Sequence, residues 1–501
     1  MNAPQSKVTN PGAVKQTKVL VSNTAIYGLG TIIRSLASFL LLPIYTQYLL
    51  PSEYGVIELL GMLVDLAGIF FGARIGQAFL RYYGLANTDN EKYQVTGSAL
   101  GMTCGMHLLA VLTLISLSGP ISELLFGSSD FKTLVQLYSL NMLLGALMEI
   151  PFAYLRANGK ALKFLGYSVL RLTLQISFNL FFLIYLEMGV YGAVYASVIA
   201  FSLAALGLTL GVVGELKPEF KWETAKSMLG FSFPIIIAAL SMFFITYSDR
   251  YFISAFLDLD SVGIYSLAYK FGFMLFALGW TPFLNMWDAE KYRIYKDQES
   301  HYLFDAVFRV VSGILVYMAF GIALWLPVVL RFMSDENYWG AASIAPIVLI
   351  AYVLLAWTNY CNLGFFTEGK TGRFGWISVV TAIFCVLGYW VSIPKYGMYG
   401  AAWVTVLAFL VRFLLIHHFA KRHFDMQLKW RSHIVSLALA LSFYLISEYW
   451  IFSDMDPVGA WAIAIRVALS LLYPVLAIAL GVIPFGHLKM FYLSIIKKRG
   501  K

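Results

Sequence analysis

Apolar stretches of about twenty residues, separated by short polar segments, follow one another along almost the whole chain. A helix needs about 20 mainly apolar residues to cross a bilayer, where only helices and closed barrels satisfy their backbone polar groups. The pattern therefore predicts an all-α integral membrane protein with fourteen transmembrane helices. We expect these helices at 20–44, 54–73, 95–118, 133–155, 164–186, 190–213, 227–248, 262–284, 303–330, 341–363, 374–393, 397–419, 433–452 and 460–484.

Basic residues fall on alternate connections between the predicted helices. Of the 36 Lys and Arg residues, 26 lie in the two terminal tails and the even-numbered connections, and only four lie in the odd-numbered ones. Cytoplasmic loops of membrane proteins carry the excess of Lys and Arg. We therefore expect cytoplasmic termini, with a tail over 1–19 and a basic tail over 487–501.

The composition agrees with a lipid-embedded chain. Hydrophobic residues make up 60% of the sequence and charged residues 13%, against roughly 25% charged in an average soluble domain. The net charge of +9 is explained by cytoplasmic loops, so no nucleic-acid partner is expected. The three cysteines are isolated in apolar stretches, and neither a disulfide framework nor a metal site is indicated.

Three short segments recur in order at nearly the same spacing. The segment 48–59 resembles 256–267, and 189–201 resembles 397–409, both at an offset of 208 residues; between them, 158–164 resembles 368–374. Such a pattern predicts a duplicated six-helix unit, and repeats of this kind commonly form a substrate site at their interface. The expected organisation is an N-lobe at 20–214, a cytoplasmic linker at 215–226, a C-lobe at 227–419 and two further helices within 420–486.

Six basic residues lie inside the predicted helices, and four of them, Arg34, Arg171, Lys270 and Arg412, are the candidates for a binding site. Ionisable residues at membrane depth are costly and are therefore functional candidates. Together these four predict a cationic cavity, which would attract an anion and, through arginine, bind phosphate with bidentate geometry. The alternative that each base simply pairs with an acid on a neighbouring helix, as Arg34 could with Asp65, stays open.

Acids are fewer within the predicted helices. Glu58 and Asp65 lie seven residues apart on the second, Glu149 lies on the fourth, and Asp249 lies near the outer end of the seventh. Near the inner end of the ninth, Asp305 and Arg309 are expected either to extend toward the membrane surface or to pair locally.

Histidine does not indicate a metal site in this chain. We expect His417, His418, His423 and His433 at a helix end and in the basic loop that follows it, facing water. No phosphate-binding lysine loop, GxSxG or HExxH motif occurs, and the longest predicted loops have about 20 residues. The sequence thus predicts a transporter and not an enzyme, and no ATP-driven transport by this chain alone.

Two segments resemble a known family. The stretch NTAIYGLGTIIRSLASFLLLPIYTQYLLPSEYGVIEL (23–59) is similar to the first two helices of the polysaccharide-transport and O-antigen flippase families. The stretch FPIIIAALSMFFITYSDRYFISAFLDLDSVGIYSLAYKF (233–271) is similar to their seventh and eighth helices. The likeness in helix number and spacing extends over nearly the whole chain.

This resemblance implies the multidrug/oligosaccharidyl-lipid/polysaccharide exporter superfamily, with two six-helix lobes that work by alternating access. It implies a flippase for an isoprenoid-pyrophosphate-linked oligosaccharide in a bacterial cytoplasmic membrane, with membrane lipids, and a polysaccharide polymerase or glycosyltransferases, as its other partners. It implies no cofactor beyond coupling to an H⁺ or Na⁺ gradient, for which Asp65, Glu149 and Asp249 are the acids to test.

Three other classes remain open at this stage. A multidrug exporter shares the architecture, but its cavity should be acidic and aromatic. A lipid II-type flippase also has fourteen helices and a cationic cavity. A membrane polymerase or glycosyltransferase normally carries a large outer loop with catalytic residues, and the predicted outer loops are short.

Overall fold

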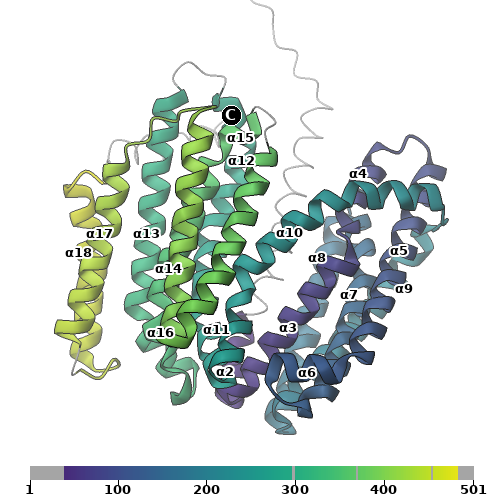
Figure 1. Cartoon of the computed structure of the whole chain (residues 1–501), viewed down its shortest axis with the longest axis horizontal. Helices are drawn as coiled ribbons and strands as arrows, with labels where there is room; N and C mark the ends of the chain where they lie inside the picture. The colour runs from purple at the N-terminus through teal and green to yellow at the C-terminus, as the bar shows by residue number, and fades with distance from the viewer. Residues whose placement is uncertain (1–38, 296–299, 368–370, 453–454, 483–501) are drawn as a thin grey trace, which may run out of the picture. The chain divides into compact units, whose positions relative to one another are not determined.

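A computed structural model describes residues 39–295, 300–367, 371–452 and 455–482 (Figure 1). These residues form helices joined by short connections, and the helices pack into two units. Unit 1 comprises residues 1–48 and 60–239, and unit 2 comprises 49–59 and 240–501, each as far as it is described. The predicted lobe boundaries stay predictions.

The helices up to the end of unit 1 range in length from 3 residues in η1 to 35 residues in α10. They are α2 (Leu42–Tyr48), α3 (Pro51–Gly72), α4 (Ile75–Leu85), α5 (Asp89–Ser116), α6 (Ser118–Phe126), η1 (Ser129–Phe131), α7 (Lys132–Ala157), α8 (Ala161–Asn179), η2 (Leu180–Tyr185), α9 (Gly189–Leu216) and α10 (Trp222–Phe256). The first turns of α3 belong to unit 2, as does the second half of α10.

The remaining helices belong to unit 2. They are α11 (Leu259–Met274), η3 (Leu275–Trp280), α12 (Thr281–Tyr295), α13 (Ser300–Met333), η4 (Glu336–Tyr338), α14 (Ala341–Cys361), α15 (Leu363–Thr367), α16 (Thr371–Lys421), α17 (Trp430–Ile446), η5 (Ser447–Ile451) and α18 (Ala460–Ala479).

Twelve helical segments of the described chain are long and apolar enough to cross a membrane. They match the predicted spans from the second to the last, because the segment Gly372–Lys421 contains two of them. The first predicted span, 20–44, lies largely outside the described residues. The prediction of an all-α membrane protein is confirmed by this arrangement.

The chain reverses direction inside α16, at Gly397. A straight helix of this length would measure about 75 Å, more than twice the thickness of the hydrocarbon core. Gly397 has a φ of 57°, in the region that favours glycine. The side-chain oxygens of Tyr389 and Thr405 then lie 2.9 Å apart, whereas sixteen residues of straight helix would separate them by about 24 Å.

The same backbone conformation occurs where the repeat predicts it. Gly189, which aligns with Gly397, has a φ of 55° and begins α9. A side chain on Gly192 would press on the Phe182 carbonyl, and one on Gly400 would press on the Ser392 carbonyl. In both positions of the repeat, therefore, glycines allow one helix to turn directly into the next.

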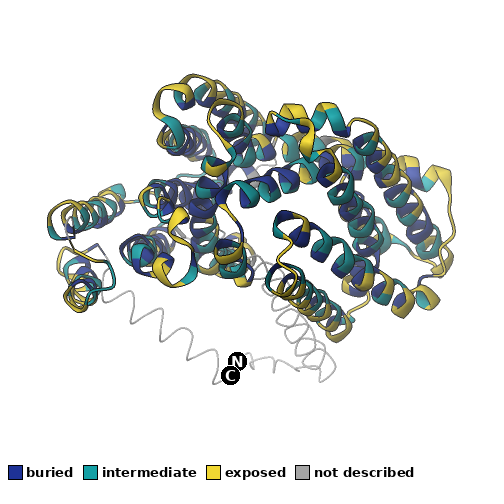
Figure 2. Cartoon of the chain, turned by 90° about the horizontal axis from the view of Figure 1, so that it is seen from below, coloured by how far each residue is buried: buried dark blue, intermediate teal, exposed yellow. Residues whose placement is uncertain are grey.

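Each unit has its own apolar core. In unit 1, α7 packs between α5 and α9, and buried side chains such as Phe79, Ile150 and Phe164 fill the interior. In unit 2, α14 packs against α11, α13 and α16, while α17 and α18 pack beside α13 at one edge. Figure 2 shows exposed positions on the outward helix faces, as expected for helices that present an apolar surface to lipid.

Candidate functional site

Four charged residues form a cluster in unit 2. Glu58 lies on the first turns of α3, Asp249 and Arg250 on α10, and Lys270 on α11. The Lys270 ammonium lies 2.8 Å from Glu58 Oε1, and Arg250 Nε lies 4.0 Å from Glu58 Oε2. Two acids and two bases therefore balance at membrane depth, where an uncompensated charge is costly.

Arg250 is fixed within this cluster from several sides. Its Nη1 donates to Asp249 Oδ1 at 3.1 Å and to the Thr246 carbonyl at 3.0 Å, and its guanidinium lies 4.6 Å from the ring centre of Tyr269. Only 4% of the side chain is exposed. Among the described residues, however, its Nε has no hydrogen-bond acceptor.

Asp249 is fully buried and well supplied with donors. Its carboxylate accepts hydrogen bonds from the Tyr265 hydroxyl at 2.9 Å and from the Arg250 backbone amide at 2.8 Å, besides the Arg250 guanidinium. A buried carboxylate is stabilised in its charged form by such donors. In this structure Asp249 therefore anchors Arg250.

A close approach of α3 and α11 brings the cluster together. A side chain on Gly55 would collide with the Leu259 carbonyl, and one on Gly263 would collide with the Pro51 carbonyl. The Ser52 amide also donates to Asp260 Oδ1 at 2.8 Å. Small residues let helix backbones touch in membranes, and here they bring Glu58 within reach of Lys270.

The other basic residues of the predicted cavity lie elsewhere. In unit 1 the Arg171 guanidinium lies 3.9 Å from the ring centre of Phe201 on α9. In unit 2 Arg412 is 3% exposed, with contacts of 3.3 Å to Met242 Sδ and 3.4 Å to Ser378 Oγ. No carboxylate of the described chain pairs with Arg412, and its Nε has no hydrogen-bond partner there. Arg34 lies outside the described residues.

The three acids expected to couple an ion have different surroundings. Asp65 is exposed on the part of α3 that belongs to unit 1. Glu149 accepts a hydrogen bond from the Gly76 amide at 3.1 Å, at the beginning of α4. Asp249 is enclosed as described above. Their predicted role in coupling stays a prediction.

Two smaller predictions are decided by the structure. Asp305 and Arg309 pair one turn apart on α13 at 2.5 Å, which confirms their local pairing. The expectation that His433 lies in a solvated loop is wrong, because His433 is buried on α17 beside Phe308 and Trp430. The basic residues of the preceding loop favoured a solvent-exposed imidazole, but aromatic side chains cover it in the structure.

The sequence pattern alone does not assign Glu58 or Arg250 to the site. The sequence signal that could have identified Glu58 is the pair Gly55 and Gly263, which are separated by the same 208 residues as the recurring segments. Gly55 and Gly263 mark a close helix contact, and Glu58 and Lys270 follow them by one and two helical turns.

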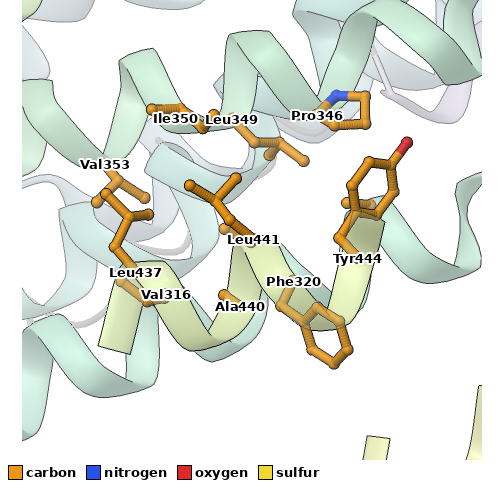
Figure 3. A pocket seen from close by; sticks show the side chains of 12 residues that line it. Val316, Phe320, Pro346, Leu349, Ile350, Val353, Leu437, Ala440, Leu441 and Tyr444 are labelled. Atoms are coloured by element: carbon orange, nitrogen blue, oxygen red, sulfur yellow. The ribbon is translucent and has the colours of Figure 1, made fainter. Parts of the chain in front are cut away.

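Unit 2 also contains an apolar groove between α13, α14 and α17 (Figure 3). Its lining includes Val316, Phe320, Leu349, Leu437 and Tyr444. Figure 3 shows the hydroxyl of Tyr444 on the side of the lining where Pro346 lies. Such a surface accepts hydrocarbon in preference to polar groups.

Comparisons with solved structures agree on the fold. The chain is similar to the lipid II flippase MurJ in an inward closed conformation, with a TM-score of 0.73 and 14% identity over 95% of this chain and 100% of that one. It is similar to an inward-facing multidrug MATE transporter, with a TM-score of 0.60 and 16% identity over 78% of this chain and 95% of that one. The predicted MATE-like fold is confirmed.

Sequence comparison extends this result. The lipid III flippase of Escherichia coli K12 is 23% identical over 389 residues, which cover 73% of this chain and 89% of that protein. The lipid III flippase of Shigella flexneri matches equally well. The relatives are flippases and transporters, which supports transport over catalysis.

The long apolar helices and the likeness to these solved structures together define a multi-pass membrane protein with a MATE-like fold. Residues 46–343 match the family model described as polysaccharide biosynthesis protein, which covers more than half of the chain. The chain belongs to this family.

Proposed function

We propose that this protein is a flippase that moves an anionic isoprenoid-pyrophosphate-linked oligosaccharide from the cytoplasmic to the outer leaflet of a bacterial cytoplasmic membrane. The cargo would serve polysaccharide synthesis, with O-antigen as the expected product class. The observation that carries the proposal is Arg412, a buried base without a carboxylate partner in the described residues, in a chain related to lipid III flippases. Transport would proceed by alternating access.

Charge supports an anionic cargo. Arg412 is a buried cation with no carboxylate partner in the described chain, and Lys270 is 23% exposed beside Glu58. In a medium of low dielectric constant, a cation without a carboxylate partner, such as Arg412, is poorly screened and attracts phosphate strongly. Arginine adds two parallel donors that match phosphate oxygens.

The apolar groove supports a cargo with a lipid tail. Its lining is aliphatic and aromatic, so it would accept part of a hydrocarbon tail in preference to a charged headgroup. We infer coupling to an H⁺ or Na⁺ gradient through Asp65, Glu149 or Asp249. A polysaccharide polymerase or glycosyltransferase is the protein partner that such a cargo implies.

A multidrug exporter is the second candidate, because MATE transporters share the fold. The likeness to the lipid II flippase, with a TM-score of 0.73 against 0.60, favours a lipid-linked cargo. A lipid II-type cargo and an oligosaccharide cargo share the pyrophosphate, so the charge argument applies to both.

The test is leaflet-resolved flipping of a fluorescent isoprenoid-pyrophosphate glycan in proteoliposomes. We expect wild type to flip it, and Arg34→Ala, Arg171→Ala, Lys270→Ala and Arg412→Ala each to lose at least about tenfold in rate, the loss of one charge-assisted hydrogen bond. Lys132→Ala is the matched control, since Lys132 is exposed at the start of α7.

Absence of flipping by a correctly inserted wild type would contradict the proposal. A lipid II analogue and a cationic dye, assayed in the same vesicles, separate the alternatives. If the protein flips only the lipid II analogue, its cargo is a lipid II-type precursor and not the proposed oligosaccharide. Export of the dye without glycan movement would identify a multidrug exporter.

A further inference from the structure

Glu58 lies unequally between two cations. It contacts Lys270 at 2.8 Å but remains 4.0 Å from Arg250 Nε, beyond hydrogen-bond distance. Arg250 Nε has no other acceptor in the described chain. A second position for the Glu58 carboxylate, hydrogen-bonded to Arg250, is therefore about one ångström away.

The two cations differ in how firmly they are held. Arg250 is 4% exposed and is fixed by Asp249, by the Thr246 carbonyl and by Tyr269. Lys270 is 23% exposed, and Glu58 is the only ion-pair partner that the described residues give it. Lys270 is thus the cation that an incoming anion can reach, and Arg250 is the one that can receive a displaced carboxylate.

We propose that Glu58 is an exchange counter-ion for Lys270. In the empty state it neutralises Lys270; when the pyrophosphate of the cargo contacts Lys270, Glu58 moves to Arg250 Nε and satisfies that buried donor. The reverse movement expels the anion. Glu58 is a positioning residue that acts through Lys270, and this proposal rests on the proposed function.

Charge balance explains why the exchange is reversible. With Glu58 on Lys270, the cluster of Glu58, Asp249, Arg250 and Lys270 is neutral. An arriving anion adds negative charge, and the repulsion between it and Glu58 falls when Glu58 turns toward Arg250. Because both positions are ion pairs, neither leaves a carboxylate buried without a partner, which would be strongly unfavourable.

The proposal predicts tighter binding when Glu58 loses its charge. Glu58→Gln keeps the size and polarity of the side chain but no longer competes for Lys270. We expect it to bind undecaprenyl pyrophosphate about tenfold more tightly than wild type, with a lower KM and a lower kcat for flipping. Lys270→Gln should bind weakly, and the double variant should resemble Lys270→Gln.

Binding is measured on the purified full-length protein by native mass spectrometry, with undecaprenyl pyrophosphate and with undecaprenol, which lacks phosphate. The affinity for undecaprenol should be equal in wild type and Glu58→Gln, because the exchange concerns charge alone. Glu123→Gln is the matched control, since Glu123 is exposed on α6 of unit 1, and it should bind both lipids like wild type.

Glu58→Asp provides a second variant that keeps the charge. Its carboxylate is one methylene shorter and cannot reach both cations, so we expect flipping to slow at least about fivefold. Equal affinity of Glu58→Gln and wild type for undecaprenyl pyrophosphate, or wild-type flipping by Glu58→Asp, would overturn the exchange while leaving the proposed function intact. A wild type that does not prefer undecaprenyl pyrophosphate over undecaprenol would overturn both.

Discussion

Gly55 of α3 packs directly against Gly263 of α11, and the two residues are separated by the 208-residue offset of the internal repeat. The contact is reciprocal. Gly55 faces the Leu259 carbonyl, about one turn before Gly263, and Gly263 faces the Pro51 carbonyl, about one turn before Gly55. The repeat is thereby connected to a specific place in the structure, close to Glu58 and Lys270.

A side chain at this contact should disrupt it. We expect Gly55→Val to destabilise the protein by about 2 kcal/mol or more, because backbone atoms cannot move aside as a flexible side chain can. Thermal unfolding in detergent measures the effect. Gly68→Ala on the same helix is the control, since open space surrounds its Cβ position, and a loss of stability there would point to a general intolerance of α3.

The break between α3 and α4 contains two non-glycine residues with positive φ, Ala73 at 46° and Arg74 at 52°. Left-handed backbone costs about 1 kcal/mol or more for such residues. Arg74 is exposed, so Arg74→Gly should raise the free energy of unfolding by about 1 kcal/mol. Arg81→Gly, in the regular part of α4, should lower it by about 1 kcal/mol. Equal effects of the two variants would contradict this explanation.

Glu149 accepts a hydrogen bond from the Gly76 amide at the beginning of α4. Helix N-termini leave amides unsatisfied and favour negative charge. Glu149→Leu should therefore destabilise unit 1 by about 1–3 kcal/mol, whereas Glu149→Gln, which keeps an acceptor, should lose less. If Glu149 also couples an ion, Glu149→Gln should flip the cargo at a rate that no longer depends on the H⁺ or Na⁺ gradient, an outcome read in proteoliposomes.

Arg412 and Arg466 are both buried but differ in their partners. Arg466 on α18 donates to the Leu324 carbonyl at 2.9 Å and the Pro457 carbonyl at 3.3 Å, while Arg412 has only weak contacts. We expect Arg466→Met to destabilise by about 2–3 kcal/mol. Arg412→Met should leave stability unchanged or higher, while flipping falls at least about tenfold. A destabilised Arg412→Met would indicate a structural role instead.

Much of the fold could be predicted from the sequence, because the length of an apolar stretch and the charge of its loops suffice to place a membrane-spanning helix. Even the turn within α16 is indicated by the GMYG segment around Gly397 and its counterpart at Gly189. These signals are local, and each depends on one span and its ends.

The site is harder to predict, because its contacts depend on how each helix is rotated and how closely two helices approach. The sequence places Lys270 among other bases, whereas in the structure it pairs with Glu58. Glu58 and Asp65 lie seven residues apart on one helix, yet they belong to different units. The pattern of apolar residues along α3 does not show that its first turns pack in one unit and the rest of the helix in the other.

The tight reversal at Gly397 also bears on biosynthesis. It leaves almost no hydrophilic chain between the two apolar halves of α16, so neither half can be translocated well before the other emerges from the ribosome. The two spans should therefore insert into the bilayer together as one helical hairpin. Contacts between them would then already reduce the free-energy cost of placing Arg412 in the membrane. A nascent chain that lacked the first half would present the arginine-bearing segment to the translocon without its partner.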